Sequence, residues 1–252
     1  MRTTHFFMSI TNILALTFIL LACSKSKDSP ILATENLYDI QQEPQVTEEK
    51  RAKYNYLALG DSYTVGQNVD ASESFPAQLE NLLEKNLNAK INTDMVAATG
   101  WRTDNLYDGI KSSSLEAVYD FVTLLIGVNN QYQGQPFSQY EEEFPLLLER
   151  ALKFTGNDPS KVIVISIPDY GYTPFGENGG MQAISKDIDT YNAFAESTAS
   201  LKNVAYVNIT DISRQGLDQP ELVADDGLHP SGKAYKMFVD RIAPFIVSAL
   251  KD

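Results

Sequence analysis

From about residue 54 onward, short apolar runs of strand length alternate with longer stretches in which apolar residues recur at helical spacing. The run Val162-Ile163-Val164-Ile165 is apolar on both faces, as a parallel strand covered by helices on each side requires. The pattern therefore predicts a parallel sheet. Its strands are expected at residues 54–59, 91–99, 120–127, 161–168 and 204–210.

Amphipathic helices are expected between these strands and after the last one. Ser74 is a favourable N-cap for a helix whose apolar positions run from Phe75 to Leu87. Similar apolar stripes begin near Met181 and after Ser231. The alternation of strands and helices predicts a doubly wound α/β fold.

A further helix is expected just after residue 138. Ser138 followed by Glu141 fits a capping box, and the apolar stripe that follows contains Pro145. Because proline lacks an N–H group and clashes with the preceding turn, Pro145 is expected to kink or restart this helix.

Four short polar segments follow the carboxyl ends of the expected strands, where open α/β sheets bind their ligands. They are Gly60-Asp61-Ser62, Gly100-Trp101-Arg102, Gly127-Val128-Asn129-Asn130 and Asp226-Gly227-Leu228-His229-Pro230. We expect these segments, which are far apart in the sequence, to meet at one rim of the sheet. The loops at residues 129–136 and 173–180 could edge the same site.

The composition excludes several classes of site. The chain of 252 residues has a formal net charge of −13, which argues against nucleic-acid binding because that binding depends on Lys and Arg. One cysteine and two histidines cannot form an internal disulfide or a metal site with several thiolate or imidazole ligands. The composition leaves carboxylate sites for hard cations open, but no loop has the spacing of an EF-hand, and no metal-binding residue is assigned.

The polar segments fit nucleophilic catalysis by a serine. Ser62 needs a base to take its proton, and His229 is the only histidine beyond residue 5. Asp226 lies three residues before His229 and could orient the imidazole. The backbone N–H groups of Ser62 and Gly100, with the side-chain amide of Asn129, could stabilise an oxyanion.

Together the segments resemble the blocks of the GDSL or SGNH hydrolase superfamily. The blocks are "GDSY", "AATGWRTDNL", "GVNN" and "DGLHPSG", and the similarity extends over about residues 54–250. The resemblance implies a flavodoxin-like three-layer α/β/α sandwich with a five-stranded parallel sheet. It also implies ester hydrolysis through an acyl-enzyme, with no metal or organic cofactor.

On this resemblance, Ser62, Asp226 and His229 would be catalytic, and Ser62, Gly100 and Asn129 would form the oxyanion hole. Two residues depart from the common pattern. Tyr63 replaces the leucine of the family name, and Asn130 replaces an aspartate that often follows the block asparagine. Asp61, Trp101 and Asn130 are further candidates for the substrate pocket.

The amino-terminal region has the pattern of an export signal. Arg2 precedes an apolar stretch at residues 6–22, and Leu20-Leu21-Ala22-Cys23 resembles the lipobox of bacterial lipoproteins. We therefore expect a signal peptide at residues 1–22, a tether lipidated on Cys23 at residues 23–50, and the hydrolase domain at residues 51–252. The protein would then be anchored by lipid in the bacterial cell envelope.

The sequence leaves three functions open. The first is a serine esterase for small acyl esters, such as acetylated carbohydrates, lysophospholipids or aryl esters. The second is an acyltransferase that passes the same acyl group to an envelope polysaccharide. The third is a flavin- or nucleotide-binding protein, because a Ser/Thr-rich loop after the first strand can hold phosphate. The third interpretation gives no role to Asp226 and His229.

Overall fold

The computed structural model describes residues 51–251. The expected signal peptide, the tether and Cys23 lie outside the described residues. Within residues 51–251, every helix is too short or too polar to cross a lipid bilayer.

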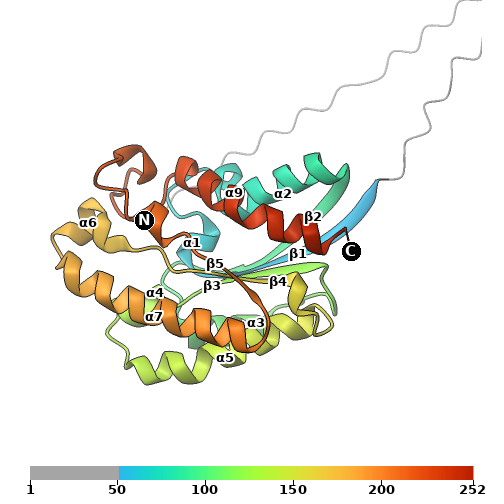
Figure 1. The fold of residues 1–252 in the computed structure, drawn as a ribbon, viewed down its shortest axis with the longest axis horizontal. Coiled ribbons are helices and arrows are strands. Elements are labelled where there is room, and N and C mark those ends of the chain that lie inside the picture. The colour runs from blue at the N-terminus through green and yellow to red at the C-terminus, as the bar shows by residue number, and fades with distance from the viewer. Residues whose placement is uncertain (1–50, 252) are drawn as a thin grey trace, which may run out of the picture. The chain divides into compact units, whose positions relative to one another are not determined.

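Five parallel strands form one sheet in the order β2-β1-β3-β4-β5 (Figure 1). The strands are β1 (Ala52–Gly60), β2 (Ala89–Ala97), β3 (Phe121–Leu125), β4 (Val162–Ile165) and β5 (Ala205–Val207). The strand order reverses between β1 and β3, and this switch point is where ligands bind in folds of this kind. The prediction of an α/β fold with a five-stranded parallel sheet is confirmed.

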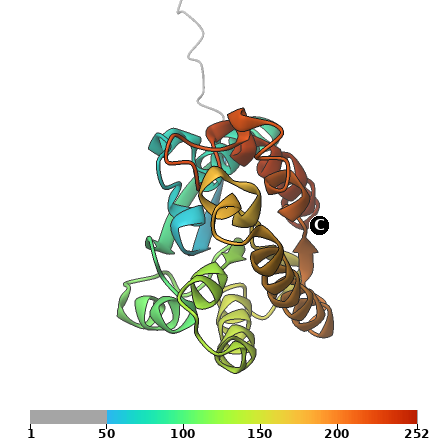
Figure 2. The same cartoon turned by 90° about the vertical axis from the view of Figure 1, so that its left-hand side faces the viewer.

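Long helices cover both faces of the sheet, so the fold has three layers (Figures 1 and 2). On one face lie α2 (Phe75–Leu87) and α9 (Gly232–Ala249), which pack against each other. On the other face lie α3 (Thr103–Ser112), α5 (Phe137–Phe154) and α7 (Met181–Leu201). Every residue of β3 and β4 is buried, as their apolar character on both faces predicts.

The remaining elements are short. They are α1 (Ser62–Val65), α4 (Val128–Tyr132), α6 (Pro174–Glu177), α8 (Thr210–Ser213) and the 3-10 turns η1 (Ala71–Glu73), η2 (Pro159–Lys161), η3 (Tyr170–Tyr172) and η4 (Pro220–Leu222). Helices α1 and α4 start within three residues of the ends of β1 and β3. They place Ser62 and Asn129 at neighbouring strand ends.

The capping box expected at Ser138 and Glu141 is wrong. Helix α5 begins at Phe137, and its N-cap is Pro136, whose extended backbone ends the preceding loop and whose carbonyl accepts the Gln139 N–H. Ser138 therefore lies inside the first turn. The helix also continues through Pro145 to Phe154, because its apolar stripe packs on the core on both sides of the proline.

Other boundaries shifted by a few residues. Strand β2 lies two residues earlier than expected, and β4 and β5 are shorter. The cap expected at Ser74 is confirmed, since its side chain accepts a hydrogen bond from the first turn of α2. Ser231 caps α9 in the same way. Helix α3 was not among the expected helices.

Candidate active site

The turn after β1 presents Ser62 to solvent-accessible space without using its side chain for capping. Asp61 is the N-cap of α1, and its Oδ1 accepts the Tyr63 N–H at 3.0 Å. A Cβ at Gly60 would lie 2.1 Å from Thr64 Oγ1, so only glycine lets the short helix fold back this closely. The Ser62 hydroxyl therefore remains available for chemistry.

The structure brings the three predicted catalytic side chains into contact. His229 Nε2 lies 3.0 Å from Ser62 Oγ, and His229 Nδ1 lies 2.6 Å from Asp226 Oδ2. The other carboxylate oxygen, Oδ1, accepts the backbone N–H groups of Leu228 and His229, each at 3.0 Å. Residues separated by 167 positions thus form one line of hydrogen bonds.

The electrostatics of this line favour proton transfer from Ser62. Burial tends to raise the pKa of Asp226, but hydrogen bonds from the His229 side chain, two backbone N–H groups and Asn68 lower it to about 2. The ionised carboxylate can only accept, so Nδ1 carries the imidazole proton and the lone pair of Nε2 faces Ser62 Oγ. The arrangement can therefore act as a general base.

The predicted oxyanion donors lie beside this line. Gly100 has a left-handed φ of 82°, and a Cβ there would meet no atom within 4 Å, so backbone conformation rather than crowding favours glycine. The Gly100 carbonyl accepts Gln133 Nε2 at 2.9 Å. Asn129 Nδ2 donates one hydrogen to the Trp101 carbonyl at 3.0 Å, which leaves its second hydrogen for a ligand.

Ser62, His229, Gly100 and Asn129 line one pocket with a cavity volume of about 260 Å³. Its other walls come from Tyr63, Thr99, Val128, Tyr132, Gln133, Tyr170, Phe175 and Leu228. Among the residues that the structure describes, no Asp, Glu, Lys or Arg side chain lines it. Tyr132 and Phe175 are 57% and 44% exposed, with ring centroids 6.0 Å apart. The pocket is thus open, uncharged and aromatic on one side.

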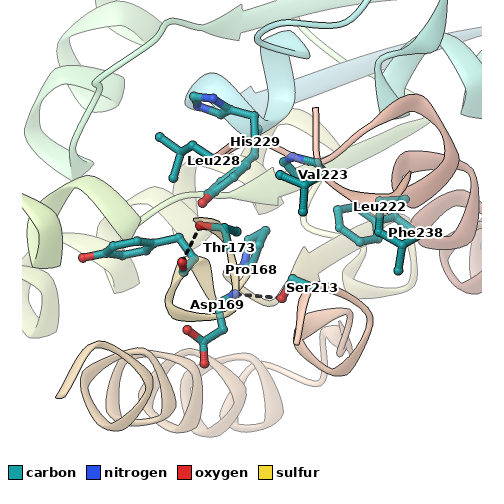
Figure 3. Close-up of a pocket in the computed structure, with 13 residues that line it drawn as sticks. Pro168, Asp169, Thr173, Ser213, Leu222, Val223, Leu228, His229 and Phe238 are labelled. Carbon is teal, nitrogen blue, oxygen red and sulfur yellow. Dashed lines mark hydrogen bonds between the residues drawn. The ribbon is translucent and has the colours of Figure 1, made fainter. Parts of the chain in front are cut away.

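A second, much smaller cavity of about 10 Å³ lies beside His229 (Figure 3). Figure 3 shows Leu228 and His229 on one side of it, and Asp169 N–H donating to Ser213 Oγ at 2.8 Å on another. Its volume leaves room for one water molecule at most. The substrate must therefore enter the larger pocket.

The three side chains expected as further pocket residues do not line the pocket. Asn130 is fully buried and holds the first residue of α3, because its Oδ1 accepts Thr103 N–H at 3.1 Å and its Nδ2 donates to Thr103 Oγ1 at 2.7 Å. The ring of Trp101 packs over Gly109. Asp61 is also fully buried. Their neighbours in sequence face the pocket, but the side chains themselves point into the protein.

Asp61, which precedes Ser62, has an unusual environment. Its Oδ2 has no hydrogen-bond partner among residues 51–251. Burial raises the pKa of the Asp61 carboxyl to about 7, although the Tyr63 N–H opposes this change. The carboxyl therefore titrates near neutral pH.

Sequence reasoning missed three residues at the site. The loops that contain Tyr132 and Phe175 were expected to edge the site, but the pattern could not show which side chains enter the pocket. Asn68 donates its Nδ2 hydrogen to Asp226 Oδ2, across 158 positions of sequence. A lone Asn in a turn gives no sequence signal for this contact.

Among residues 51–251, no group of three or more His, Cys, Asp or Glu side chains is arranged to hold a metal ion.

The chain is similar to one family of enzymes in sequence. It matches the model of the GDSL-like lipase/acylhydrolase family over residues 58–237. A search of curated proteins finds no significant match.

Several solved structures share the fold. A variant of the acetyl xylan esterase Axe2 from Geobacillus stearothermophilus has a TM-score of 0.61 and 17% identity, over 78% of this chain and 95% of that one. A lipase/acylhydrolase from Enterococcus faecalis has a TM-score of 0.61 and 18% identity, over 77% and 96%. The esterase EstA from Pseudoalteromonas sp. has a TM-score of 0.53 and 16% identity, over 79% and 100%.

The structural likenesses establish the fold, and the family model covers most of the described residues, including Ser62 and His229. The chain therefore belongs to the GDSL-like lipase/acylhydrolase family and is a carboxylic ester hydrolase.

Proposed function

We propose that the protein is a serine esterase that cleaves small, uncharged acyl esters through an acyl-enzyme on Ser62. The observation that carries this proposal is the continuous line of hydrogen bonds from Ser62 through His229 to Asp226. A flavin- or nucleotide-binding protein has no use for this line.

In the first half-reaction, Ser62 Oγ attacks the ester carbonyl while its proton passes to His229 Nε2. The tetrahedral oxyanion receives hydrogen bonds from the backbone N–H groups of Ser62 and Gly100 and from Asn129 Nδ2. Loss of one such donor typically costs about 3 kcal/mol of transition-state stabilisation. Collapse breaks the bond to the alcohol, which leaves with the proton from His229.

In the second half-reaction, His229 takes a proton from water as the water attacks the acyl-serine. Collapse of this intermediate releases the carboxylic acid, and the proton returns to Ser62 Oγ. Asp226 remains ionised throughout and stabilises the imidazolium in both halves.

The walls of the pocket support a short acyl group and a neutral alcohol. A cavity of about 260 Å³ lies below the range of most sites for drug-sized ligands, and its described lining has no charged side chain to pair with a phosphate or carboxylate. Tyr132 and Phe175 offer half-exposed rings on which a flat alcohol, such as a sugar or aryl ring, could stack. The fold shared with an acetyl xylan esterase supports acetylated carbohydrate as one such substrate.

The test compares the wild type with Ser62→Ala on p-nitrophenyl acetate, butyrate and octanoate and on acetylated xylo-oligosaccharides. We expect turnover of the acetyl esters by the wild type, none by Ser62→Ala, and full activity in Ser112→Ala, which changes an exposed serine of α3. A fluorophosphonate should label the wild type on Ser62 alone. Normal activity in Ser62→Ala would refute the proposal, and acyl-sugar products in place of free acid would identify a transferase.

We also propose that the protein is anchored in the cell envelope by a lipid on Cys23. The support is the sequence Leu20-Leu21-Ala22-Cys23 after an apolar stretch. Radiolabelled palmitate should be incorporated into the wild type and not into Cys23→Ser. Equal labelling of both proteins would refute the anchor without affecting the assignment as an esterase.

A further inference from the structure

The turn that follows the nucleophile helix α1 is tightly attached to Ser62. The N–H groups of Gly66 and Gln67 both donate to the Ser62 carbonyl, at 3.0 and 3.1 Å. Gly66 and Asn68 have left-handed φ angles of 79° and 62°, which reverse the chain within three residues. The backbone from which the side chains of Gln67 and Asn68 extend is therefore anchored to Ser62.

Asn68 reaches from this turn to the catalytic carboxylate. Its Nδ2 donates to Asp226 Oδ2, the same oxygen that accepts His229 Nδ1. A carboxylate can only accept hydrogen bonds, so the amide must present its nitrogen. The Asp226 side chain is 23% exposed, and Asn68 meets it on the solvent side of the catalytic line.

Gln67 reaches in a different direction, to the oxyanion loop. Its Oε1 accepts the hydroxyl of Thr99 at 2.6 Å. Thr99 immediately precedes Gly100, whose N–H is a proposed oxyanion donor. Two consecutive side chains of one turn thus contact the two loops that must be aligned with Ser62.

We propose that Gln67 and Asn68 are positioning residues. They align the loop that carries Gly100 (the oxyanion loop) and the loop that carries Asp226 (the acid loop) with the nucleophile Ser62. The proposal rests on the proposed esterase function. Asn68 closes a ring of contacts, because Ser62 binds His229, His229 binds Asp226, Asp226 binds Asn68, and the turn returns to Ser62 through its backbone. With Asn68 removed, Oδ2 keeps only its bond to His229, and nothing in this ring ties the acid loop directly to the nucleophile turn.

The two contacts have different electrostatic consequences. The Asn68 N–H shares the negative charge of Asp226, so its removal leaves a carboxylate that attracts the imidazolium more strongly. The acid limb of the pH–rate profile, on which protonated His229 is inactive, should then move to higher pH. The Gln67 contact involves no charged group, so its removal should leave that limb in place.

Other titratable groups near the pair do not alter this comparison. Those from neighbouring elements that line the cavities beside His229 or interact with Asp226 are Tyr63, Asp169, Tyr170 and Tyr235. The Asp169 carboxylate is paired with Arg214 at 2.9 Å and is the same in every variant. Burial raises the pKa of Tyr170 to about 12 and the pKa of Tyr63 and Tyr235 well above its usual value, so all three stay neutral. Asp61 titrates near pH 7 but is the same in every variant.

The test uses the full chain and p-nitrophenyl acetate as substrate. Asn68→Gly removes the amide and retains the left-handed backbone, which glycine adopts readily. Asn68→Asp keeps the size and replaces the donor with an acceptor. Asn203→Gly is the matched control, because Asn203 has a φ of 57° and precedes β5, at the opposite end of the sheet.

We expect Asn68→Gly to lower kcat by about five- to twentyfold, the range of one hydrogen bond to a charged group at a partly exposed site. KM should change less than about twofold, since the contact does not touch substrate. The acid limb should move to higher pH, and it should move further in Asn68→Asp. Gln67→Ala should lower kcat with the acid limb unmoved, and Asn203→Gly should match the wild type.

Wild-type kcat and an unmoved acid limb in both Asn68 variants would overturn the proposal. A fall in kcat with an unmoved acid limb and a lower melting temperature would also overturn it, because that result indicates a structural role. If the wild type hydrolyses no ester, the proposed function fails by itself. The NMR resonance of His229 Nδ1–H then decides the positioning contact: a shift in Asn68→Gly supports it, and an unchanged resonance overturns it.

Discussion

Replacement of Asp61 by asparagine should remove a pH-dependent destabilisation of the fold at the residue that precedes Ser62. The Asp61 side chain is fully buried, and its Oδ2 has no partner among the described residues. Burial raises the pKa of this carboxyl from 3.8 to about 7 in the folded protein. The new asparagine would still offer an oxygen to the Tyr63 N–H, and this residue type is as good an N-cap as aspartate.

The sign and size of the effect follow from proton linkage. Between pH 4 and 7 the unfolded chain loses the Asp61 proton while the folded protein keeps it, so the free energy of unfolding falls as pH rises. Each pKa unit corresponds to about 1.4 kcal/mol, so the full loss is about 4 kcal/mol and is complete above pH 7. Asparagine does not titrate. The free energy of unfolding of Asp61→Asn, relative to the wild type, should therefore increase by about 4 kcal/mol between about pH 4 and pH 8.

Urea unfolding at a series of pH values measures this difference, with the fluorescence of the single tryptophan, Trp101, as the signal. Titration of all other groups is common to both proteins and cancels in the comparison. Asp70→Asn is the matched control, because Asp70 is an exposed N-cap of η1 with no side-chain hydrogen bond to that turn. If the free energy of unfolding depends on pH in the same way in the wild type and in Asp61→Asn, the reasoning is refuted.

Three further changes test the site and its support. Asp226→Asn should lower kcat by up to about 10⁴-fold, because an amide favours the wrong imidazole tautomer. Steady-state kinetics should show this fall with KM little changed, and a near-normal kcat would contradict the prediction. Gly60→Ala would place a Cβ 2.1 Å from Thr64 Oγ1 and should cost about 1–3 kcal/mol in urea unfolding, whereas wild-type stability would show that the turn can relax. Tyr132→Ala should raise KM for phenyl acetate several-fold, because it removes about 1 kcal/mol of contact between the two rings. KM for ethyl acetate, which has no ring, should stay unchanged. Equal effects on the two esters would argue against stacking.

The sequence determined the fold class and the candidate chemistry. Runs such as Val162–Ile165 are apolar on both faces, and only burial between two helical layers satisfies them. In a parallel sheet all carboxyl ends lie at one edge, so the residues after each strand had to meet. Ser62, Gly100 and Asn129, which follow β1, β2 and β3, therefore lie together. His229 lies beyond α8 and η4, and it was assigned as the only histidine beyond residue 5 that could act as the base.

The local pattern was less informative about helix ends and side-chain direction. Ser138 and Glu141 have the right spacing for a capping box, yet the extended Pro136 ends the loop first. Asp61 and Asn130 adjoin pocket residues, but each side chain points inward to hold a helix start. Adjacent residues of a tight turn point in different directions, and the sequence does not reveal which of them faces the cavity.

Contacts between loops that no strand register relates could be found only in the folded molecule. Asn68 meets Asp226 because the turn after α1 and the loop before α9 approach each other in space, 158 residues apart in the chain. Tyr132 and Phe175 share one wall of the pocket for the same reason. A periodic pattern indicates which face of its own helix or strand a residue lies on. Contacts between loops depend instead on how the loops of different elements fold over the sheet.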